Sequence, residues 1–378
     1  MAITPFNDPI YVTRPLLPAL TDLHPRLEEV WQARWLTNDG EQHGRLTTAI
    51  GNYLDVPQVS LFNNGTIALL AALRALNVRG EVVTTPFTFP ATPHAISWNG
   101  GTPVFADIDP VRLTLDPARV EAAITPRTTA ILAVHVYGIP CDVDGLQDVA
   151  SRHGLKLIYD AAHAFGTRIN GTGIGNFGDA SMFSFHATKL FHSAEGGALT
   201  CSAAETKVAF DHLKNFGILG QEAVAEIGIN GKMNELQAAL GLAVLEIVPE
   251  ELRRRQAIIR RYRERLDAIP GLTIMSEPAG VESSCQYFVV RIDEAAFGCS
   301  RDTLYDRFKH YNVFARKYFH PLCSDYDCYR QLPSSAASGL PVANAAVRQV
   351  LCLPLYGTLS LEAVDTICDI MMEIRAAA

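Results

Sequence analysis

Seven short apolar segments alternate with helical patterns between residues 59 and 201, and this alternation constrains the fold of the 378-residue chain more than any other feature. Short apolar runs separated by segments of helical periodicity are typical of parallel strands joined by helices that cover both sheet faces. We therefore expect an α/β fold built on a mostly parallel, seven-stranded sheet flanked by helices. The predicted strands are residues 59–62, 81–85, 103–107, 130–134, 156–160, 180–184 and 198–201.

The remainder of the chain predicts a smaller α/β unit. Helical patterns cover residues 233–247, ending near Pro249, and residues 250–269, which are rich in charge. The segments 286–292 and 301–311 and a closing helix at 361–375 follow. We expect a large domain over residues 51–249 and a small C-terminal domain over residues 250–378.

Lys189 is the candidate catalytic residue, because it stands alone in an apolar, aromatic and glycine-punctuated segment, residues 184–197 (SFHATKLFHSAEGG). A desolvated lysine loses its proton readily, and the neutral amine can form a Schiff base with an aldehyde. Pyridoxal 5'-phosphate is the cofactor that supplies such an aldehyde. Taken by itself, the segment is also compatible with a solvated surface lysine.

Asp160 ends the predicted strand 156–160, at the sheet edge where open α/β folds bind ligands. A carboxylate there can keep the pyridine nitrogen of the cofactor protonated, which makes the ring an electron sink. The alternative for an isolated aspartate is the N-cap of a following helix. Lys189 downstream favours the cofactor role.

Gly65 and Thr66 are candidate phosphate contacts. They follow Asn63 and Asn64, where a short apolar strand turns into a strongly helical segment. The N-terminus of a helix offers unpaired N–H groups and the positive end of a dipole, so it suits a phosphate. Such junctions also occur without a ligand, and the assignment therefore depends on Lys189 and Asp160.

These three segments, in this order, resemble the DegT/StrS family of sugar-nucleotide aminotransferases in the aspartate aminotransferase superfamily. The likeness covers most of the chain and includes residues 35–40 (WLTNDG), 85–92 (TPFTFPAT), 105–110 (FADIDP), 135–138 (HVYG) and 228–239 (GINGKMNELQAA). The resemblance implies the fold type I of pyridoxal-phosphate enzymes. It also implies that residues 1–50 pack on the small domain or on a partner subunit.

The resemblance further implies a role for each matching residue. Lys189 would bind the cofactor covalently and move a proton at the substrate carbon, while Asp160 would pair with the pyridinium. Phe89 would stack on the ring of the cofactor, and His163, at a position that is often Gln, would reach the phenolic oxygen or the substrate. Ser184 would bind the phosphate. Asn230 would bind the phosphate held by the neighbouring subunit of a homodimer. From the residues alone, core packing for Phe89, a small strand residue at Ser184 and a turn at Asn230 remain alternatives.

Residues 159–166 (YDAAHAFG) and 185–192 (FHATKLFH) are similar to family members that convert dTDP-4-keto-6-deoxyglucose to dTDP-4-amino-4,6-dideoxyglucose. This implies L-glutamate as amino donor, 2-oxoglutarate as its product and a pathway to surface polysaccharide such as O-antigen. Amination at carbon 3 is an alternative, and a cofactor-binding regulator without turnover is another. Candidate contacts of the sugar nucleotide are Arg316, Lys317 and Tyr318, for which surface solvation is the alternative.

The composition of the chain limits the classes of partner and the cellular compartment that we expect for the protein. A net charge of -8 argues against nonspecific nucleic-acid binding, which needs a basic surface. Eight cysteines without a C-x-x-C pair, no signal-peptide pattern in residues 1–6 and no apolar run long enough for a bilayer predict reduced thiols in the cytoplasm. His186 and His192 flank Lys189 without a third ligand, so we expect no metal site.

Overall fold

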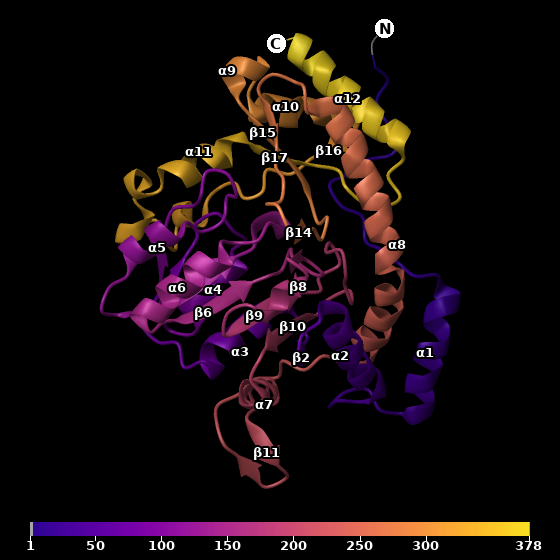
Figure 1. Ribbon diagram of the computed structural model, residues 1–378. Coiled ribbons are helices and arrows are strands. Elements are labelled where there is room, and N and C mark those ends of the chain that lie inside the picture. Colours follow the sequence, from indigo (N-terminus) through magenta and orange to yellow (C-terminus); the bar gives the residue numbers. More distant parts are fainter. Residues whose placement is uncertain (1–2, 378) are drawn as a thin grey trace.

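The computed structural model describes residues 3–377, which form a large α/β body and a smaller unit joined to it by one long helix (Figure 1). The body contains a seven-stranded sheet in the order β2-β10-β9-β6-β5-β3-β4. Only β10 runs antiparallel to its neighbours. The strands are β2 (Gln58–Phe62), β3 (Glu81–Thr84), β4 (Thr102–Phe105), β5 (Thr128–Val134), β6 (Lys156–Asp160), β9 (Ala180–Ser184) and β10 (Gly197–Cys201). The predicted sheet is confirmed, and the strand ends differ from the prediction by two residues at most.

Helices cover both faces of this sheet. One face packs on α3 (Gly65–Ala75), α4 (Ala91–Trp98) and α7 (Ala204–Leu213), and the other on α5 (Pro117–Ala123) and α6 (Val143–His153). Because the central strands are buried on both sides, they carry continuous apolar runs instead of alternating ones. A third core joins α2 (Glu41–Leu54) to the edge of the sheet.

The smaller unit contains an antiparallel sheet in the order β13-β15-β17. Its own core is separate from those of the body and includes Tyr262, Phe288 and Met371. Near its N-terminus the chain also joins this unit, because β1 (Ile10–Tyr11) pairs with β16 (Val313–Phe314). The remaining elements are α1 (Leu20–Ala33), β7 (Arg168–Ile169), β8 (Thr172–Gly173), β11 (Ile218–Gly220), β12 (Ala223–Val224), β13 (Leu272–Ile274), β14 (Val281–Glu282), β15 (Phe288–Ile292), α9 (Glu294–Phe297), α10 (Arg301–Phe308), α11 (Pro341–Gln349), β17 (Val350–Leu353) and α12 (Leu361–Ala376).

Helix α8 (Glu235–Leu266) is continuous through Pro249, so the prediction of two helices that meet there is wrong. A proline inside a helix removes one backbone hydrogen bond. Pro249 lies on the exposed face of α8, where water can bind the carbonyl that is freed. The neighbouring side chains of Val248 and Glu251 are buried and hold both halves to the protein. The predicted domain boundary at 249/250 falls inside α8 and stays a prediction.

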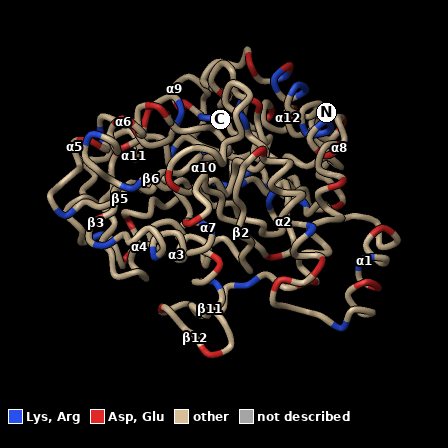
Figure 2. Tube along the Cα trace, turned by 60° about the horizontal axis from the view of Figure 1, so that its bottom comes forward, with Lys and Arg blue, Asp and Glu red and all other residues tan. Residues whose placement is uncertain are grey.

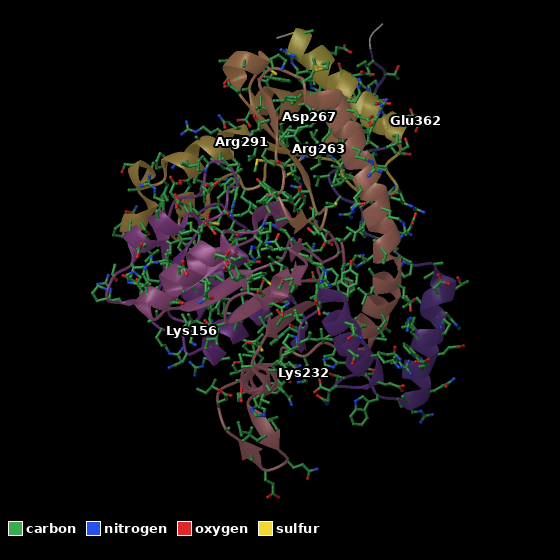
Figure 3. All side chains as sticks on the ribbon, in the orientation of Figure 1. Lys156, Lys232, Arg263, Asp267, Arg291 and Glu362 are labelled. Atoms are coloured by element: carbon green, nitrogen blue, oxygen red, sulfur yellow. The ribbon has the colours of Figure 1, made fainter. Side chains whose placement is uncertain are left out.

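Acidic and basic residues are interspersed along the whole trace (Figure 2). Exposed ion pairs such as Arg263–Asp267, at 3.6 Å near the end of α8, are labelled in Figure 3. Pairs of this kind contribute about 1 kcal/mol or less, so the apolar cores hold the fold together. Within residues 3–377, no helix is long and apolar enough to cross a membrane.

Candidate active site

A cavity of about 700 Å³ opens where strands β2, β3, β5, β6 and β9 end. The carboxyl ends of parallel strands meet at one edge of a sheet, which is where α/β folds bind ligands. Side chains of the smaller unit close the other side of this cavity. Of the residues predicted from the sequence, those that line it are Gly65, Thr66, Phe89, Asp160, His163, Ser184, Lys189, Arg316 and Tyr318.

Lys189 lies in a turn after β9, where its backbone N–H donates to the carbonyl of His186 at 2.9 Å. Its side chain is half-buried and lines the cavity. Loss of water contacts lowers the pKa of Lys189 to about 8, and the carboxylate of Asp160 opposes this shift only in part. A substantial fraction of the amine is therefore uncharged, and nucleophilic, near neutral pH.

Asp160 is buried at the end of β6 and is held by two donors. Thr92 Oγ1 donates to its Oδ2 at 2.8 Å, and the Ala162 N–H donates to its Oδ1 at 3.1 Å. Thr88 Oγ1 lies 2.9 Å from Thr92 Oγ1 and must be the donor, because Thr92 uses its only hydrogen on the carboxylate. Burial raises the pKa of Asp160, whereas these donors and Lys189 favour the ionised form. Turns follow Asp160 instead of a helix, so it is not an N-cap.

His163 is a buried, neutral side chain at the cavity wall. Its Nδ1 accepts the N–H of Tyr137 at 3.3 Å, which leaves the ring hydrogen on Nε2. Burial and the charge of Lys189 lower the pKa of His163 well below its ordinary value. The ring stacks on Phe319 at 5.7 Å and meets Tyr287 edge-on at 5.2 Å, so its orientation is fixed.

The N-terminus of α3 forms one end of the cavity. The Asn64 side chain caps this helix by accepting the Ile67 N–H at 2.9 Å. The earlier amides, those of Gly65 and Thr66, line the cavity together with Ser184. A Cβ atom at residue 65 would lie only 3.1 Å from Ser184 Cβ, so the glycine lets the helix end approach β9 closely. Backbone donors and a hydroxyl at a positive helix end suit a phosphate.

The other predicted residues lie in different places. Phe89 is 58% exposed and lines the cavity, which excludes core packing. Arg316 is exposed at the cavity. Lys317 lies outside the lining, and its Nζ donates to Asp302 at 2.9 Å. Asn230 also lies outside this chain's cavity, and its Oδ1 accepts from Lys232 Nζ at 3.0 Å.

The two histidines beside the lysine have separate contacts. His186 Nε2 lies 3.7 Å from a carboxylate oxygen of Glu195, and His192 Nε2 lies 2.7 Å from the carbonyl of Leu16. Among residues 3–377, no group of three histidine, cysteine or acidic side chains is arranged to hold a metal ion.

Several residues that line or support the cavity were not identified from the sequence. Thr88 and Thr92 lie four residues apart in a segment already singled out, but Thr88 precedes α4 and only Thr92 lies on it, so no helical spacing marks the pair. Tyr287 and Phe319 come from the smaller unit, more than ninety residues after Lys189, and no local pattern marks them.

The chemistry of these groups matches the parts of pyridoxal 5'-phosphate. The Lys189 amine suits its aldehyde, Asp160 its pyridine nitrogen, and the α3 N-terminus with Ser184 its phosphate. Phe89 adds an exposed aromatic face for the ring. The fold and the cavity thus define a pyridoxal-phosphate enzyme of fold type I.

The chain belongs to the DegT/DnrJ/EryC1/StrS aminotransferase family, whose model matches residues 21–372. It is 44% identical over 366 residues to dTDP-4-amino-4,6-dideoxy-D-glucose transaminase of Escherichia coli, covering 96% of this chain and 98% of the relative. DesI, crystallised with its TDP-sugar product, superposes with a TM-score of 0.94 at 36% identity, covering 99% of this chain and 95% of DesI. The PLP form of the sugar aminotransferase Spr1654 from Streptococcus pneumoniae superposes with a TM-score of 0.90 at 26% identity, covering 98% and 99%. The predicted family, fold, cofactor and transaminase class are confirmed.

Proposed function

We propose that this aminotransferase moves the amino group of L-glutamate to dTDP-4-keto-6-deoxyglucose and forms dTDP-4-amino-4,6-dideoxyglucose. The 44% identity with the E. coli transaminase, over nearly the full length of both chains, carries this proposal. The TDP-sugar in the DesI crystals agrees with the same substrate class. A 3-keto sugar nucleotide is the alternative substrate, because the cavity residues do not distinguish the two carbons.

Each cavity residue has a role in this reaction. Bound pyridoxal 5'-phosphate withdraws electrons from the substrate carbon and stores the amino group between the two half-reactions. Asp160, fixed by Thr92, stabilises the positive charge on the pyridine nitrogen. Lys189 Nζ, with its pKa near 8, takes a proton from the substrate carbon in one half-reaction and returns one in the other.

Both substrates would use one anion contact in turn. Arg316 is exposed at the cavity and comes from the smaller unit, opposite the sheet. A guanidinium is suited to a carboxylate or a pyrophosphate, because it presents several parallel donors. We assign Arg316 to the charged part of glutamate and of the sugar nucleotide, with Tyr318 beside it. Lys317 is already paired with Asp302, so it is a weaker candidate for this anion contact.

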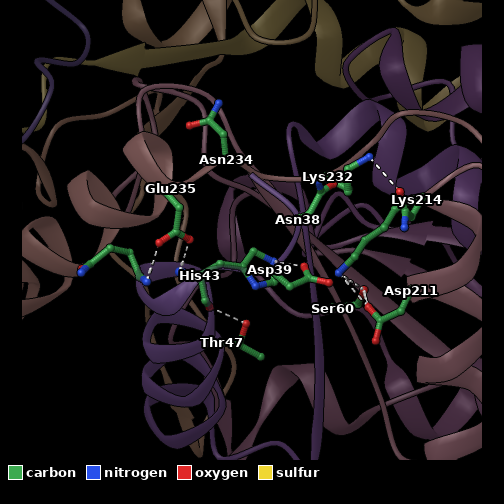
Figure 4. Close-up of polar contacts among 12 residues, drawn as sticks. Asn38, Asp39, His43, Thr47, Ser60, Asp211, Lys214, Lys232, Asn234 and Glu235 are labelled. Atoms are coloured by element: carbon green, nitrogen blue, oxygen red, sulfur yellow. Dashed lines mark hydrogen bonds and ion pairs between the residues drawn. The ribbon is translucent and has the colours of Figure 1, made fainter. Parts of the chain in front are cut away.

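We also propose a homodimer whose active sites are shared. The β11–β12 hairpin projects from the body (Figure 1), and its segment exposes large apolar side chains. They are Phe216, Ile218, Leu219, Val224, Ile227 and Ile229. A projecting apolar arm is stabilised when a partner covers it. Close to it in the chain, Lys232, which is labelled in Figure 4, donates from Nζ to the Asn230 Oδ1 at 3.0 Å.

Mixing two inactive variants tests the shared site. In a mixed dimer of Lys189→Ala and Asn230→Ala chains, a shared arrangement leaves one site with both residues intact. Random pairing should then restore about a quarter of the wild-type activity. No restoration in dimers shown to be mixed by mass spectrometry would contradict the shared site. Monomers at working concentration would contradict the dimer itself.

The absorbance of the cofactor tests the main proposal. L-Glutamate should abolish the band of the lysine-bound cofactor in the wild type, and dTDP-4-keto-6-deoxyglucose should restore it. Lys189→Ala should show neither change. NMR of the product distinguishes amination at carbon 4 from amination at carbon 3. Absence of the cofactor band, or equal turnover by Lys189→Ala, would refute the proposed function.

Cellular location and pathway stay predictions. The cytoplasm is the proposed location, because all eight cysteines are free thiols, as is usual in a reducing compartment. Surface polysaccharide such as O-antigen is the proposed destination of the product.

A further inference from the structure

A segment of the smaller unit contacts the backbone on both sides of Lys189. Gln286 lies in this segment, between β14 and β15, and is only 3% exposed. Its Oε1 accepts the N–H of Leu190 at 2.8 Å, and its Nε2 donates to the carbonyl of Thr188 at 3.1 Å. One bond needs an acceptor and the other a donor, so the amide has a single satisfactory orientation.

The segment that carries Gln286 is itself fixed from two directions. Arg255 Nη1 of α8 donates to the carbonyl of Cys285 at 3.3 Å, and Glu251 accepts from Arg255 Nε at 2.6 Å. Ser284 Oγ donates to the carbonyl of His163 at 2.7 Å. The glutamine side chain therefore projects from a rigid support instead of a free loop.

The turn that carries Lys189 needs such a contact. It belongs to no helix or strand, so its peptide groups have no regular partners in a ladder. The Lys189 N–H bonds within the turn, to His186, whereas the neighbouring groups of Thr188 and Leu190 are bonded by Gln286. These two bonds fix the planes of the peptide groups that precede and follow the lysine.

We propose that Gln286 is a positioning residue for Lys189: it holds the lysine backbone so that Nζ stays at the substrate carbon in both half-reactions. The inference rests on the proposed role of Lys189. It predicts that loss of the Gln286 amide slows proton transfer and leaves substrate affinity unchanged. A displacement of about 1 Å at a reacting group lowers rates roughly 100-fold.

Gln286→Met is the test variant, because it keeps the length of the side chain and removes both hydrogen bonds. Gln349→Met is the control; Gln349 accepts from Arg291 at 2.9 Å in the same unit and contacts no residue of the lysine turn. We expect kcat of Gln286→Met to fall about 10- to 100-fold with KM within twofold. Hydrogen exchange in a peptide that contains Leu190 should also accelerate. The control should keep wild-type kcat and exchange.

A wild-type kcat for Gln286→Met would overturn the inference, and so would a change confined to KM. If this variant does not fold, Gln286→Glu replaces it, because Glu keeps the acceptor for Leu190 and loses the donor to Thr188. Lower kcat at the wild-type melting temperature then supports the inference, and unchanged kcat refutes it. Activity in Lys189→Ala would refute the proposed function instead, so the two failures are distinguishable.

Discussion

The Thr92 hydroxyl should matter to catalysis as well as to folding, because its hydrogen bond ends on Asp160. Thr92→Val keeps the shape of the side chain and removes the 2.8 Å bond to Oδ2. Asp160 then keeps the Ala162 N–H, at 3.1 Å, as its protein donor. A buried hydrogen bond to a charged group contributes roughly 1.5–3 kcal/mol. If the reaction needs the ionised carboxylate, kcat should fall about 10- to 100-fold.

The half-reaction with L-glutamate is the appropriate assay, since its rate can be followed by the loss of the cofactor band in a single turnover. Thr84→Val is the matched control. Thr84 is equally buried, and its Oγ1 donates to the Leu132 carbonyl at 2.8 Å within the same sheet. In urea unfolding Thr92→Val should lose roughly 1.5–3 kcal/mol of stability and Thr84→Val about 1 kcal/mol, and only Thr92→Val should lose rate.

Two results would refute this reasoning. A half-reaction rate of Thr92→Val within twofold of wild type would mean that the carboxylate does not depend on this donor. An equal loss of rate in Thr84→Val would mean that general loosening of the sheet, and not the state of Asp160, controls the reaction.

Three further changes have defined outcomes. The pKa of Lys189 is about 8 and the neutral amine is the reactive form. Capture of pyridoxal phosphate by the apoenzyme should therefore accelerate as the pH rises through about 8 and level off by about pH 9. Stopped-flow absorbance measures this rate, and a rate that does not change with pH would contradict the prediction. Asp107→Ala should lower the free energy of unfolding by roughly 2–4 kcal/mol, since its carboxylate accepts two N–H groups at the start of α11 at 2.9 Å each. Asp109→Ala, which removes the turn contacts of Oδ1 with the Val111 and Arg112 N–H groups, should lower it by about 1 kcal/mol, and equal losses in urea would contradict the stronger role of Asp107 at the start of α11. Gly65→Ala should weaken cofactor binding by roughly tenfold or more, because the new Cβ would meet Ser184 at 3.1 Å, and unchanged affinity in equilibrium dialysis would place the phosphate elsewhere.

The sheet could be predicted because each strand is marked locally. Strand β5 is apolar along nearly its whole length, since both of its faces are covered by helices. The same argument places Asp160 and Ser184 together, because both end parallel strands of one sheet. Thus the cofactor half of the site follows from topology and from the family resemblance, without knowledge of any distant contact.

Contacts between the two units could not be predicted in this way. Tyr287 and Phe319 reach His163 from short connections in the smaller unit, where neither helical nor strand periodicity applies. Asn230 was assigned by resemblance and Lys317 as a cationic donor for the pyrophosphate, and neither lies at this chain's own cavity. For Asn230 the assignment needs a second copy of the chain.

The continuity of α8 through Pro249 also bears on the contact made by Gln286. If the helix ended at Pro249, Arg255 would no longer be held in line with the body, and the segment that carries Gln286 would lose one of its two supports. Because Pro249 faces solvent, α8 continues and carries the buried Glu251 and Arg255 to the segment that holds Gln286. A rigid support of this kind is what a positioning contact requires. The exposure of the Pro249 side chain, which a sequence does not reveal, therefore lets α8 support the part of the smaller unit that contacts the lysine turn.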